Sequence, residues 1–505
     1  MCRRPTAMSN MDIKPWLRRY EDVDQFYLST AVVVCGYGGA GAAAALEARR
    51  AGADVLVLER ASGGGGSTQM SSCEMYLGGS GGTALQKDVG LEDSTDNMIA
   101  YLSECFGPHG DPEKIRLYAE GAAGHFDWVE SLGVPYKREV YLERVVVPSS
   151  DESLLFTGNE RAWPFTELAE PVPRGHVPSK EGDEGGKIFM QALMKIVEAE
   201  GALIKSDARV IALLQDDANR VRGVVARIDG QEQAIEATRG VILTAGGFVQ
   251  NRTMLEKHCA QTIPFGEPYG NQWDMGDGIQ MGMAAGGNTI NMDQCFITFA
   301  FYPPAKLTYG ILVNNKGQRY INEDAYLARL GHYASLQEHQ QVFMLAQHED
   351  FELPHYMDPP PPIVGTGDTI AEAEAEAGLP LGSLQATVDY YNTHAAVGED
   401  PLFHKASNWL KPIDKPPFAI ISLKPADTKY PLGENTGYLM FTLGGLETRP
   451  TGEVLTPQGD VIPGLYAAGR TTAGLPRTAK GYGSGMSVGD ATFFGRMAGK
   501  QAAAT

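Results

Sequence analysis

Three glycines near the start of the chain are spaced to bring the backbone against a phosphate. Gly36, Gly38 and Gly41 follow the pattern GxGxxG, and Glu59 stands eighteen residues after Gly41. In this pattern the first glycine allows a tight turn, the second lets a pyrophosphate approach, and the third lets a helix pack on a strand. A carboxylate at this separation can accept hydrogen bonds from ribose hydroxyls. The chemistry indicated is recognition of a dinucleotide.

A strand–helix–strand unit must position these residues. The β-branched run 31–35 reads as a strand, the alanine-rich stretch 42–50 as a helix, and 53–58 as a second strand that ends at Glu59. The helix start would offer unpaired N–H groups and a positive dipole end to the phosphates. An ordinary glycine-rich turn is the alternative, but both strands, the helix and the acid are in register.

Further glycine clusters indicate which dinucleotide is bound. The runs at 60–68 and 78–82 are typical either of flexible linkers or of backbone wrapped around a flat cofactor, and we favour the second. A late strand-to-glycine turn at 463–470 and a terminal helix at 485–498 would complete the site. Only one complete fingerprint is present, and no reactive cysteine pair accompanies it, so we expect FAD. The terminal helix could aim its positive end at the flavin.

The residues expected to bind FAD come from all of these segments. They are Gly36, Tyr37, Gly38, Gly39, Ala40, Glu59, Arg60, Ser67, Thr68, Val210, Ala245, Gly246, Asp277, Gly469, Arg470, Gly485, Met486, Ser487 and Val488. Position 73 and its neighbours offer no histidine for covalent attachment, so we expect non-covalent FAD. His332 and His339 lack an HExxH pattern or an acidic partner, and no metal is expected.

Composition excludes several classes of protein. The chain has 505 residues, 60 of them glycine, and a formal net charge of −20. A surface this negative repels nucleic acids and anionic lipids. No apolar run approaches the roughly 18 residues needed to span a bilayer. The opening residues lack an apolar signal core, and the six cysteines form no CxxC pair, so we expect a cytoplasmic protein without a zinc site.

A change in composition predicts the domain order. Residues 29–287 and 425–505 contain glycine-terminated strands, whereas 288–424 has fewer glycines and longer helices such as 383–397. We predict an α/β fold, with a Rossmann-like FAD-binding domain in two parts and an α+β capping domain inserted at 288–424. Residues 1–28 are expected to form a loose arm. The remaining expected elements are a helix at 186–201 and strands at 209–214, 221–228, 233–237 and 240–247.

This order of segments resembles the fumarate reductase and succinate dehydrogenase flavoprotein superfamily. The runs Thr-Leu-Gly-Gly at 442–445, Asp-Gly at 277–278 and Phe-Gly-Arg-Met-Ala-Gly at 494–499 are similar to superfamily segments. The resemblance implies a substrate held over the flavin, between the FAD domain and a mobile capping domain. Where the dicarboxylate enzymes have a histidine and an arginine, this chain has Phe441 and Tyr482. A dianion would lose its charge-assisted bonds there, so a neutral ketone fits better.

Other segments resemble the 3-ketosteroid Δ4-(5α)-dehydrogenase family. They are 82–87, 173–178, 317–324, 441–446 and 480–485. The resemblance implies that Tyr320, Tyr482 and Ser484 are catalytic. Tyr482, with a backbone N–H near Met486, would polarise a steroid C3 ketone, and Tyr320 with Ser484 would remove the C4 proton. The C5 hydrogen would pass to flavin N5, and an electron acceptor that the sequence does not identify would reoxidise the flavin.

Alternatives remain open for both the reaction and the residues. The first is a 3-ketosteroid Δ1-dehydrogenase, the second an enone or fumarate-type reductase, and the third a flavin-binding protein without catalysis. Tyr320 could instead be a half-buried core aromatic, and Ser484 could merely cap the terminal helix. Sequence fixes the identity of these side chains but not the distances between them.

Overall fold

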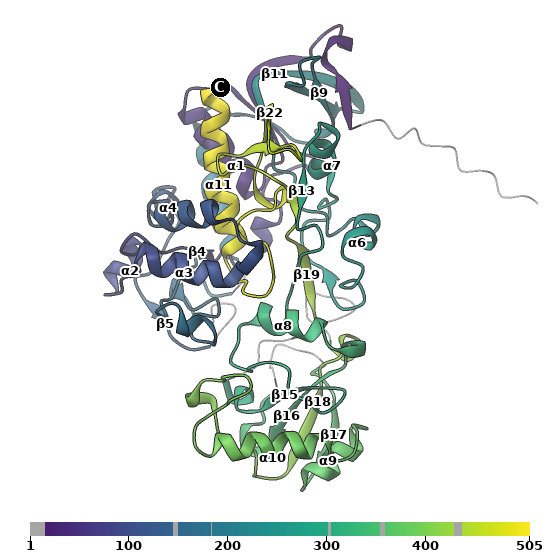
Figure 1. Ribbon diagram of the computed structural model, residues 1–505. Coiled ribbons are helices and arrows are strands. Elements are labelled where there is room, and N and C mark those ends of the chain that lie inside the picture. The colour runs from purple at the N-terminus through teal and green to yellow at the C-terminus, as the bar shows by residue number, and fades with distance from the viewer. Residues whose placement is uncertain (1–15, 145–149, 183, 301–304, 354–358, 429–436) are drawn as a thin grey trace, which may run out of the picture.

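The glycine motif lies in a nine-stranded sheet at one end of the molecule (Figure 1). The computed structural model describes residues 16–144, 150–182, 184–300, 305–353, 359–428 and 437–505. Seven strands follow the order β1-β9-β10-β11-β2-β3-β8, and β22 joins through β11 and pairs with β21. Their bounds are β1 (Leu17–Arg19), β2 (Leu28–Cys35), β3 (Val55–Leu58), β8 (Leu203–Lys205), β9 (Arg209–Gln215), β10 (Val221–Ile228), β11 (Gln231–Leu243), β21 (Glu453–Leu455) and β22 (Val461–Ala467).

The predicted strand–helix–strand unit is confirmed as β2, helix α1 (Gly39–Arg50) and β3, with the two strands paired in parallel. Helix α11 (Met486–Ala504) packs along α1, and Figure 1 shows the two side by side. Small residues allow this approach, since a Cβ added at Gly499 would lie 2.1 Å from the Ala44 carbonyl oxygen. Helix α1, near the N-terminus, is therefore packed against helix α11, near the C-terminus.

A lobe of helices and short strands covers one flank of α11 (Figure 1). Its small sheet has the order β4-β7-β6-β5. The lobe contributes several of the largest fully buried side chains, including Tyr76, Tyr101 and Arg174. Its elements are β4 (Met75–Tyr76), α2 (Ala84–Asp88), α3 (Thr95–Phe106), α4 (Pro112–Ser131), β5 (Val140–Tyr141), β6 (Leu154–Leu155) and β7 (Gly175–His176), followed by α5 (Gly185–Ala199) beside α1.

A second sheet, with the order β15-β16-β18-β17, lies at the opposite end of the molecule (Figure 1). Its bounds are β15 (Ile311–Asn314), β16 (Val342–Gln347), β17 (Ile363–Gly367) and β18 (Phe418–Ser422), with α8 (Leu327–Ser335), α9 (Ile370–Glu376) and α10 (Ser383–Ala395). Beside it is a buried ionic group in which Arg319 binds both Glu323 and Asp400, and Lys405 contacts Glu323. This unit falls within the stretch predicted as the capping domain.

Short elements connect the two ends. They are α6 (Arg252–His258), β12 (Glu267–Pro268), α7 (Asp277–Ala284), β13 (Thr289–Ile290), β14 (Cys295–Ile297), β19 (Leu439–Thr442) and β20 (Gly445–Leu446). Strand β19 pairs with both β12 and β14, while β20 pairs with β13. The chain therefore leaves the first sheet and returns to it through adjacent strands.

The expected elements form with small differences. Helices α5, α10 and α11 and strands β9 and β10 occupy the predicted stretches. The strands expected at 233–237 and 240–247 are one strand, β11, with a register irregularity between Ala237 and Gly240. Part of the expected loose arm is ordered, because β1 pairs with β9. Residues 1–15 of that arm lie outside the described residues.

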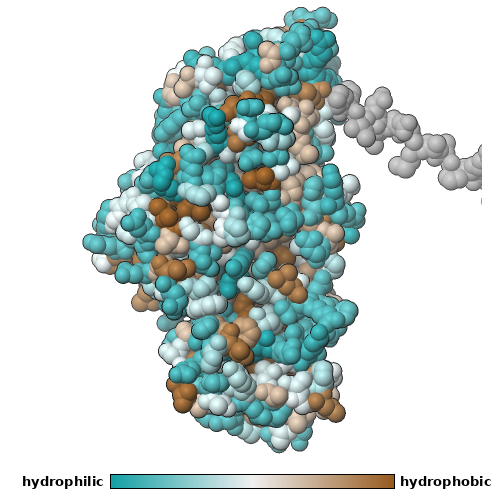
Figure 2. Space-filling view, viewed as in Figure 1, coloured by the Kyte–Doolittle hydropathy of each residue, from teal (hydrophilic) through white to brown (hydrophobic). Residues whose placement is uncertain are grey.

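The face of the molecule in Figure 2 is mostly hydrophilic, with hydrophobic residues scattered in small groups. The apolar side chains instead gather inside, where one large cluster surrounds α1 and α11 and another lies beneath α8. In the described part of the chain, no helix is long and apolar enough to cross a membrane.

Candidate active site

A cavity of about 930 Å³ extends from the glycine motif to the residues around α8. Its walls include the carboxyl ends of β2 and β3, the loop after β11, the turn after β22 and the start of α11. In open α/β sheets ligands bind outside the carboxyl ends of the strands, so this is the expected place for a nucleotide.

At one end of the cavity, the start of α1 is arranged to receive an anion. Gly38 is the N-cap and makes no side-chain cap bond, and the Gly39 N–H donates to Thr68 Oγ1 at 3.3 Å. The positive end of the helix dipole faces the cavity at this point. Gly36 has φ +110°, and a Cβ there would lie 2.6 Å from the Thr244 carbonyl oxygen. Only glycine fits this turn, in agreement with the motif.

Glu59 is held in a fixed orientation at the same end. One carboxylate oxygen accepts a hydrogen bond from the Tyr37 N–H at 2.8 Å, and the other accepts one from the Ala61 N–H at 2.8 Å. Nearby, Arg60 stacks over the Trp273 ring at 3.9 Å and pairs with Asp277 at 3.3 Å. The acid is thus presented beside the glycine turn, as ribose recognition requires.

The start of α11 is a second helix end on the same cavity. Gly485 is the N-cap, with φ +95° and no side-chain cap bond. A Cβ at Gly485 would lie 2.8 Å from the backbone nitrogen of Tyr76, which shows how closely the chain packs here. Two helix starts with positive dipole ends fit FAD, whose pyrophosphate is an anion and whose reduced flavin is one too.

All but one of the residues expected to bind FAD line this cavity. The exception is Met486, which is fully buried in the core around α1 and α11 and does not line the cavity. Its N–H donates to the Gly483 carbonyl oxygen at 3.2 Å, so that group is already used in the turn. Two other expected residues are held by one carboxylate: Ser67 donates a hydrogen bond to Asp274 at 3.0 Å, and Arg470 pairs with the same Asp274.

The other end of the cavity is aromatic. Phe296 and Phe441 stack with their centroids 4.4 Å apart, and the Tyr482 ring lies 4.7 Å from Phe296. Phe299, Leu327 and Leu439 also line it. Four arginines line the cavity, and each is engaged: Arg60 and Arg209 with Asp277, Arg470 with Asp274, and Arg144 with three backbone carbonyls. This end suits an uncharged guest more than a dicarboxylate.

Tyr482 lines the aromatic end and is only 4% exposed. Its hydroxyl donates to Ser487 Oγ at 2.9 Å and accepts from the Ser487 N–H at 3.3 Å. Burial raises the pKa of Tyr482 to about 12, although the bonds from Ser487 oppose the shift. The phenol therefore stays protonated at neutral pH and can donate to a ketone.

Ser484 is paired with a tyrosine that the sequence analysis did not single out. The Tyr326 hydroxyl lies 2.8 Å from Ser484 Oγ, and Tyr326 is the N-cap residue of α8. Ser484 lines the cavity and makes no capping bond to α11, so the alternative of a helix cap is wrong. The pair joins the capping stretch of the chain to the loop before α11.

Tyr320 lies elsewhere. Its hydroxyl is buried and has no hydrogen-bond partner among the described residues, and its ring packs on the hydrophobic cluster beneath α8. It is not among the residues that line the cavity, and burial raises its pKa well above the ordinary value. The expected pairing of Tyr320 with Ser484 is therefore corrected to Tyr326 with Ser484. The only sequence signal was a second tyrosine shortly after the same Asn-Glu-Asp run.

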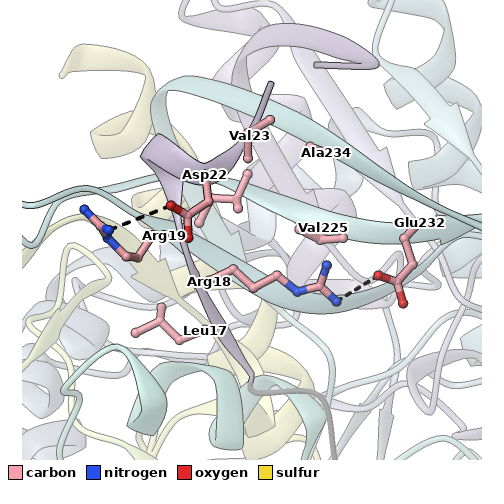
Figure 3. A pocket seen from close by; sticks show the side chains of 9 residues that line it. Leu17, Arg18, Arg19, Asp22, Val23, Val225, Glu232 and Ala234 are labelled. Atoms are coloured by element: carbon pink, nitrogen blue, oxygen red, sulfur yellow. Dashed lines mark hydrogen bonds and ion pairs between the residues drawn. The ribbon is translucent and has the colours of Figure 1, made fainter. Parts of the chain in front are cut away.

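A smaller hollow of about 490 Å³ lies between β1 and the β9–β11 strands (Figure 3). Its two arginines are paired with carboxylates: Arg18 with Glu232 at 2.9 Å, and Arg19 with Asp22 at 3.8 Å. Across the described residues, no three His, Cys, Asp or Glu side chains form a group that could hold a metal. The large cavity is the place where groups suited to chemistry converge.

Comparison with known proteins agrees with this site. The family model of the FAD binding domain matches residues 31–486. The structure of 3-ketosteroid-Δ4-(5α)-dehydrogenase from Rhodococcus jostii RHA1, in complex with 4-androstene-3,17-dione, is 40% identical, with a TM-score of 0.89, and the match covers 96% of this chain and 99% of that one.

More distant relatives share the fold. The 3-oxo-5-alpha-steroid 4-dehydrogenase of Comamonas testosteroni is 25% identical over 508 residues, covering 89% of this chain and 94% of that protein. The probable fumarate reductase Ifc3 of Shewanella frigidimarina is 26% identical over 497 residues, covering 94% of this chain and 75% of that protein. These matches confirm the α/β fold with a Rossmann-like FAD-binding domain, and FAD as the cofactor. The chain belongs to the FAD-binding domain family, and within it to the flavoprotein oxidoreductases that resemble 3-ketosteroid-Δ4-(5α)-dehydrogenase.

Proposed function

We propose that this enzyme removes hydrogen across the C4–C5 bond of 5α-3-ketosteroids. The observation that supports this most directly is that a protonated Tyr482 and Ser484 line one aromatic pocket, and that Ser484 is hydrogen-bonded to the buried Tyr326. The relative from Rhodococcus jostii, described with a bound 3-ketosteroid, has the same fold over nearly its whole length.

Tyr482 is the group that would polarise the C3 ketone. Its hydroxyl is fixed by Ser487, and it carries a proton at neutral pH because burial raises its pKa to about 12. As a proton leaves C4, negative charge builds on the ketone oxygen, and a donor aimed at that oxygen stabilises the charge. Such donors contribute about 10²–10³ in rate.

Ser484 and Tyr326 would remove the C4 proton together. Their oxygens are 2.8 Å apart, so a proton can pass from one hydroxyl to the other. For Ser484 to take the proton from C4, its own proton must pass to the Tyr326 oxygen, so Tyr326 would first have to give up the proton that it donates to Ser484 Oγ. When bound, FAD supplies the oxidant, a two-electron acceptor for the hydrogen at C5. The residues that would hold FAD are those at the starts of α1 and α11.

Anaerobic mixing with 5α-androstane-3,17-dione tests this function. We expect the flavin absorbance to bleach and the product to be a 4-en-3-one, identified by its mass and ultraviolet spectrum. A product unsaturated at C1–C2 would instead make the chain a Δ1-dehydrogenase. An unbleached flavin with every saturated 3-ketosteroid would favour a reductase or a flavin-binding protein without this activity.

A further inference from the structure

A short segment of the chain, residues 157–159, contacts the backbone on both sides of the Ser484–Tyr326 pair. We call it the alignment segment. Thr157 and Asn159 are 0% and 1% exposed, so their polar atoms are buried and their hydrogen bonds exclude water. The segment follows β6 and belongs to the lobe beside α11, not to the unit that contains Tyr326.

Thr157 holds Ser484 through two hydrogen bonds. The Ser484 N–H donates to the Thr157 carbonyl oxygen at 2.7 Å, and the Thr157 hydroxyl donates to the Ser484 carbonyl oxygen at 2.9 Å. Two bonds of opposite direction fix the position and the rotation of the Ser484 backbone. The direction of Ser484 Oγ is then set to one of a few rotamers.

Asn159 holds Tyr326 in the same way from two residues further along. Its side-chain oxygen accepts a hydrogen bond from the Tyr326 N–H at 2.8 Å. The three residues before Tyr326 are held by the same lobe, because Arg144 donates to the carbonyl oxygens of Glu323, Asp324 and Ala325 at 2.8–3.1 Å. The backbone of Tyr326 is therefore fixed by groups outside its own unit.

The alignment segment is itself rigid. The Asn159 N–H donates to the Tyr101 hydroxyl at 2.8 Å, and the Gly158 N–H donates to Glu160 at 2.9 Å. Glu160 also accepts from the Tyr76 hydroxyl at 2.8 Å. A Cβ at Gly158 would lie 2.4 Å from the Tyr101 oxygen, so the backbone here is pressed against that phenol. The segment can act as a fixed reference for the two residues that it binds.

We propose that Thr157 and Asn159 are positioning residues that set the distance between Ser484 Oγ and the Tyr326 hydroxyl, and so the rate of proton removal. The inference rests on the proposed function. Because the two hydroxyls come from different parts of the chain, nothing within either part fixes their separation. Proton transfer depends steeply on such distances, and a displacement of about 1 Å can cost 10²-fold in rate.

The test uses the FAD-loaded enzyme and anaerobic stopped-flow reduction by 5α-androstane-3,17-dione, with and without deuterium at C4. Asn159→Ala removes the acceptor for Tyr326. We expect the limiting rate of flavin reduction to fall at least about tenfold, with a larger C4 isotope effect, while the half-saturating steroid concentration and FAD content stay the same. Thr157→Val keeps the backbone carbonyl but loses the hydroxyl. It should also lower the limiting rate of flavin reduction and raise the C4 isotope effect.

Two further variants separate positioning from general support. Asn159→Asp keeps an acceptor oxygen for the Tyr326 N–H. It loses no other hydrogen bond, because the Asn159 Nδ2 has no partner among the described residues. The rate of flavin reduction in this variant should therefore be within about threefold of the rate in the unaltered enzyme. Asn97→Ala removes bonds to Asp93 and Glu170 in the same lobe, away from the pair, and should leave the isotope effect unchanged.

The outcomes are distinct. If steroid does not reduce the unaltered enzyme, the proposed function fails and the inference fails with it. If steroid reduces the unaltered enzyme but Asn159→Ala keeps its rate and isotope effect, only the inference is overturned. It is also overturned if Asn97→Ala shows the same kinetic change as Asn159→Ala. If Asn159→Ala does not retain FAD, Thr157→Val decides: an unchanged rate and isotope effect overturn the inference.

Discussion

Tyr482 and Ser487 bind each other through two hydrogen bonds, so the phenol oxygen is fixed before a ketone arrives, and its proton must turn from Ser487 Oγ to the ketone when one binds. This single contact determines what the tyrosine can do. A phenol with a pKa of about 12 is a weak base but a reliable donor, which suits it to polarising the ketone and not to removing a proton. The donor role assigned to Tyr482 therefore follows from its burial.

Tyr482→Phe should keep FAD and lose turnover at least about tenfold, since only the developing oxyanion loses a donor. The pKa of Tyr482 is raised, so the donor is present at low pH and is lost only as the pH rises toward about 12. The ratio of the flavin-reduction rate of the unaltered enzyme to that of Tyr482→Phe, measured anaerobically, should therefore be constant from pH 6 to pH 10. A ratio that collapses toward one within that range would contradict this role.

Tyr326→Phe and Tyr320→Phe form a matched pair. Both replace a buried phenol by a ring of nearly the same size, but only Tyr326 reaches Ser484. We expect Tyr326→Phe to slow flavin reduction at least about tenfold and Tyr320→Phe to leave it within about twofold. Rates measured with the same steroid decide, and the reverse order would restore Tyr320 as the partner of Ser484.

Two of the three residues assigned to the reaction, Tyr482 and Ser484, could be predicted from the sequence, but Tyr326, the hydrogen-bond partner of Ser484, could not. Tyr482 and Ser484 lie in a glycine-rich loop where few other roles are open to them. Tyr320 and Tyr326 flank the run Asn-Glu-Asp in one motif, and the sequence alone does not tell which of them binds Ser484. That is decided by contacts from distant segments, because Asn159 and Arg144 hold the backbone at Tyr326.

Among the elements, the unit β2–α1–β3 depends on close contact at its third glycine. A Cβ at Gly41 would lie 2.0 Å from the Gly36 carbonyl oxygen, within the turn that faces the cofactor. Gly41→Ala should therefore purify without yellow colour and bind added FAD at least about tenfold more weakly. Gly63→Ala is the control, since nothing lies within 4 Å of its added Cβ. Titration of FAD into both proteins measures the difference.

The same unit shows which elements are predictable. Local signals mark β2, α1 and β3: a β-branched run, a glycine turn, alanines and a second run. Strand β1 has no such signal. Its three residues, Leu-Arg-Arg, become a strand only because β9 offers a free edge for parallel pairing. Pairing between distant segments is invisible to local patterns, so part of the arm expected to be loose is ordered.

The ionic group beside β15 predicts how the second sheet responds to acid. Burial raises the pKa of Glu323 and of Asp400, but their bonds and charges with Arg319 outweigh it, so both carboxylate pKa values are lowered. A lowered pKa adds stability that is present above the ordinary carboxylate range of about 4 and is lost as the pH falls below it. Hydrogen exchange at β15–β18 should therefore accelerate below about pH 4, ahead of the first sheet.

Removing the cation tests the same group at neutral pH. Arg319→Met would leave Glu323 and Asp400 buried with one partner fewer, and we expect a loss of about 3–5 kcal/mol in unfolding free energy. Arg252→Met breaks an exposed pair with Glu256 and should cost less than about 1 kcal/mol. Denaturant unfolding of the two variants compares them, and equal losses would contradict a buried network.

For the molecule as a whole, we expect FAD to be held without a covalent bond. Among the described residues, no histidine lines the cavity, in keeping with the absence of a histidine near position 73. Heat or acid precipitation should therefore release FAD into the supernatant, leaving a colourless pellet. A pellet that stays yellow after precipitation would show a covalent link and overturn this expectation.

The packing of α11 on α1 has a consequence for how the protein is made. The residues of the groove for the cofactor's phosphates are translated early, but the helix that supports the groove and completes the flavin end is translated hundreds of residues later. A nascent chain halted anywhere before α11 lacks that second wall. Yellow colour in a pool of ribosome products would consequently report that translation had passed through Gly485 and beyond.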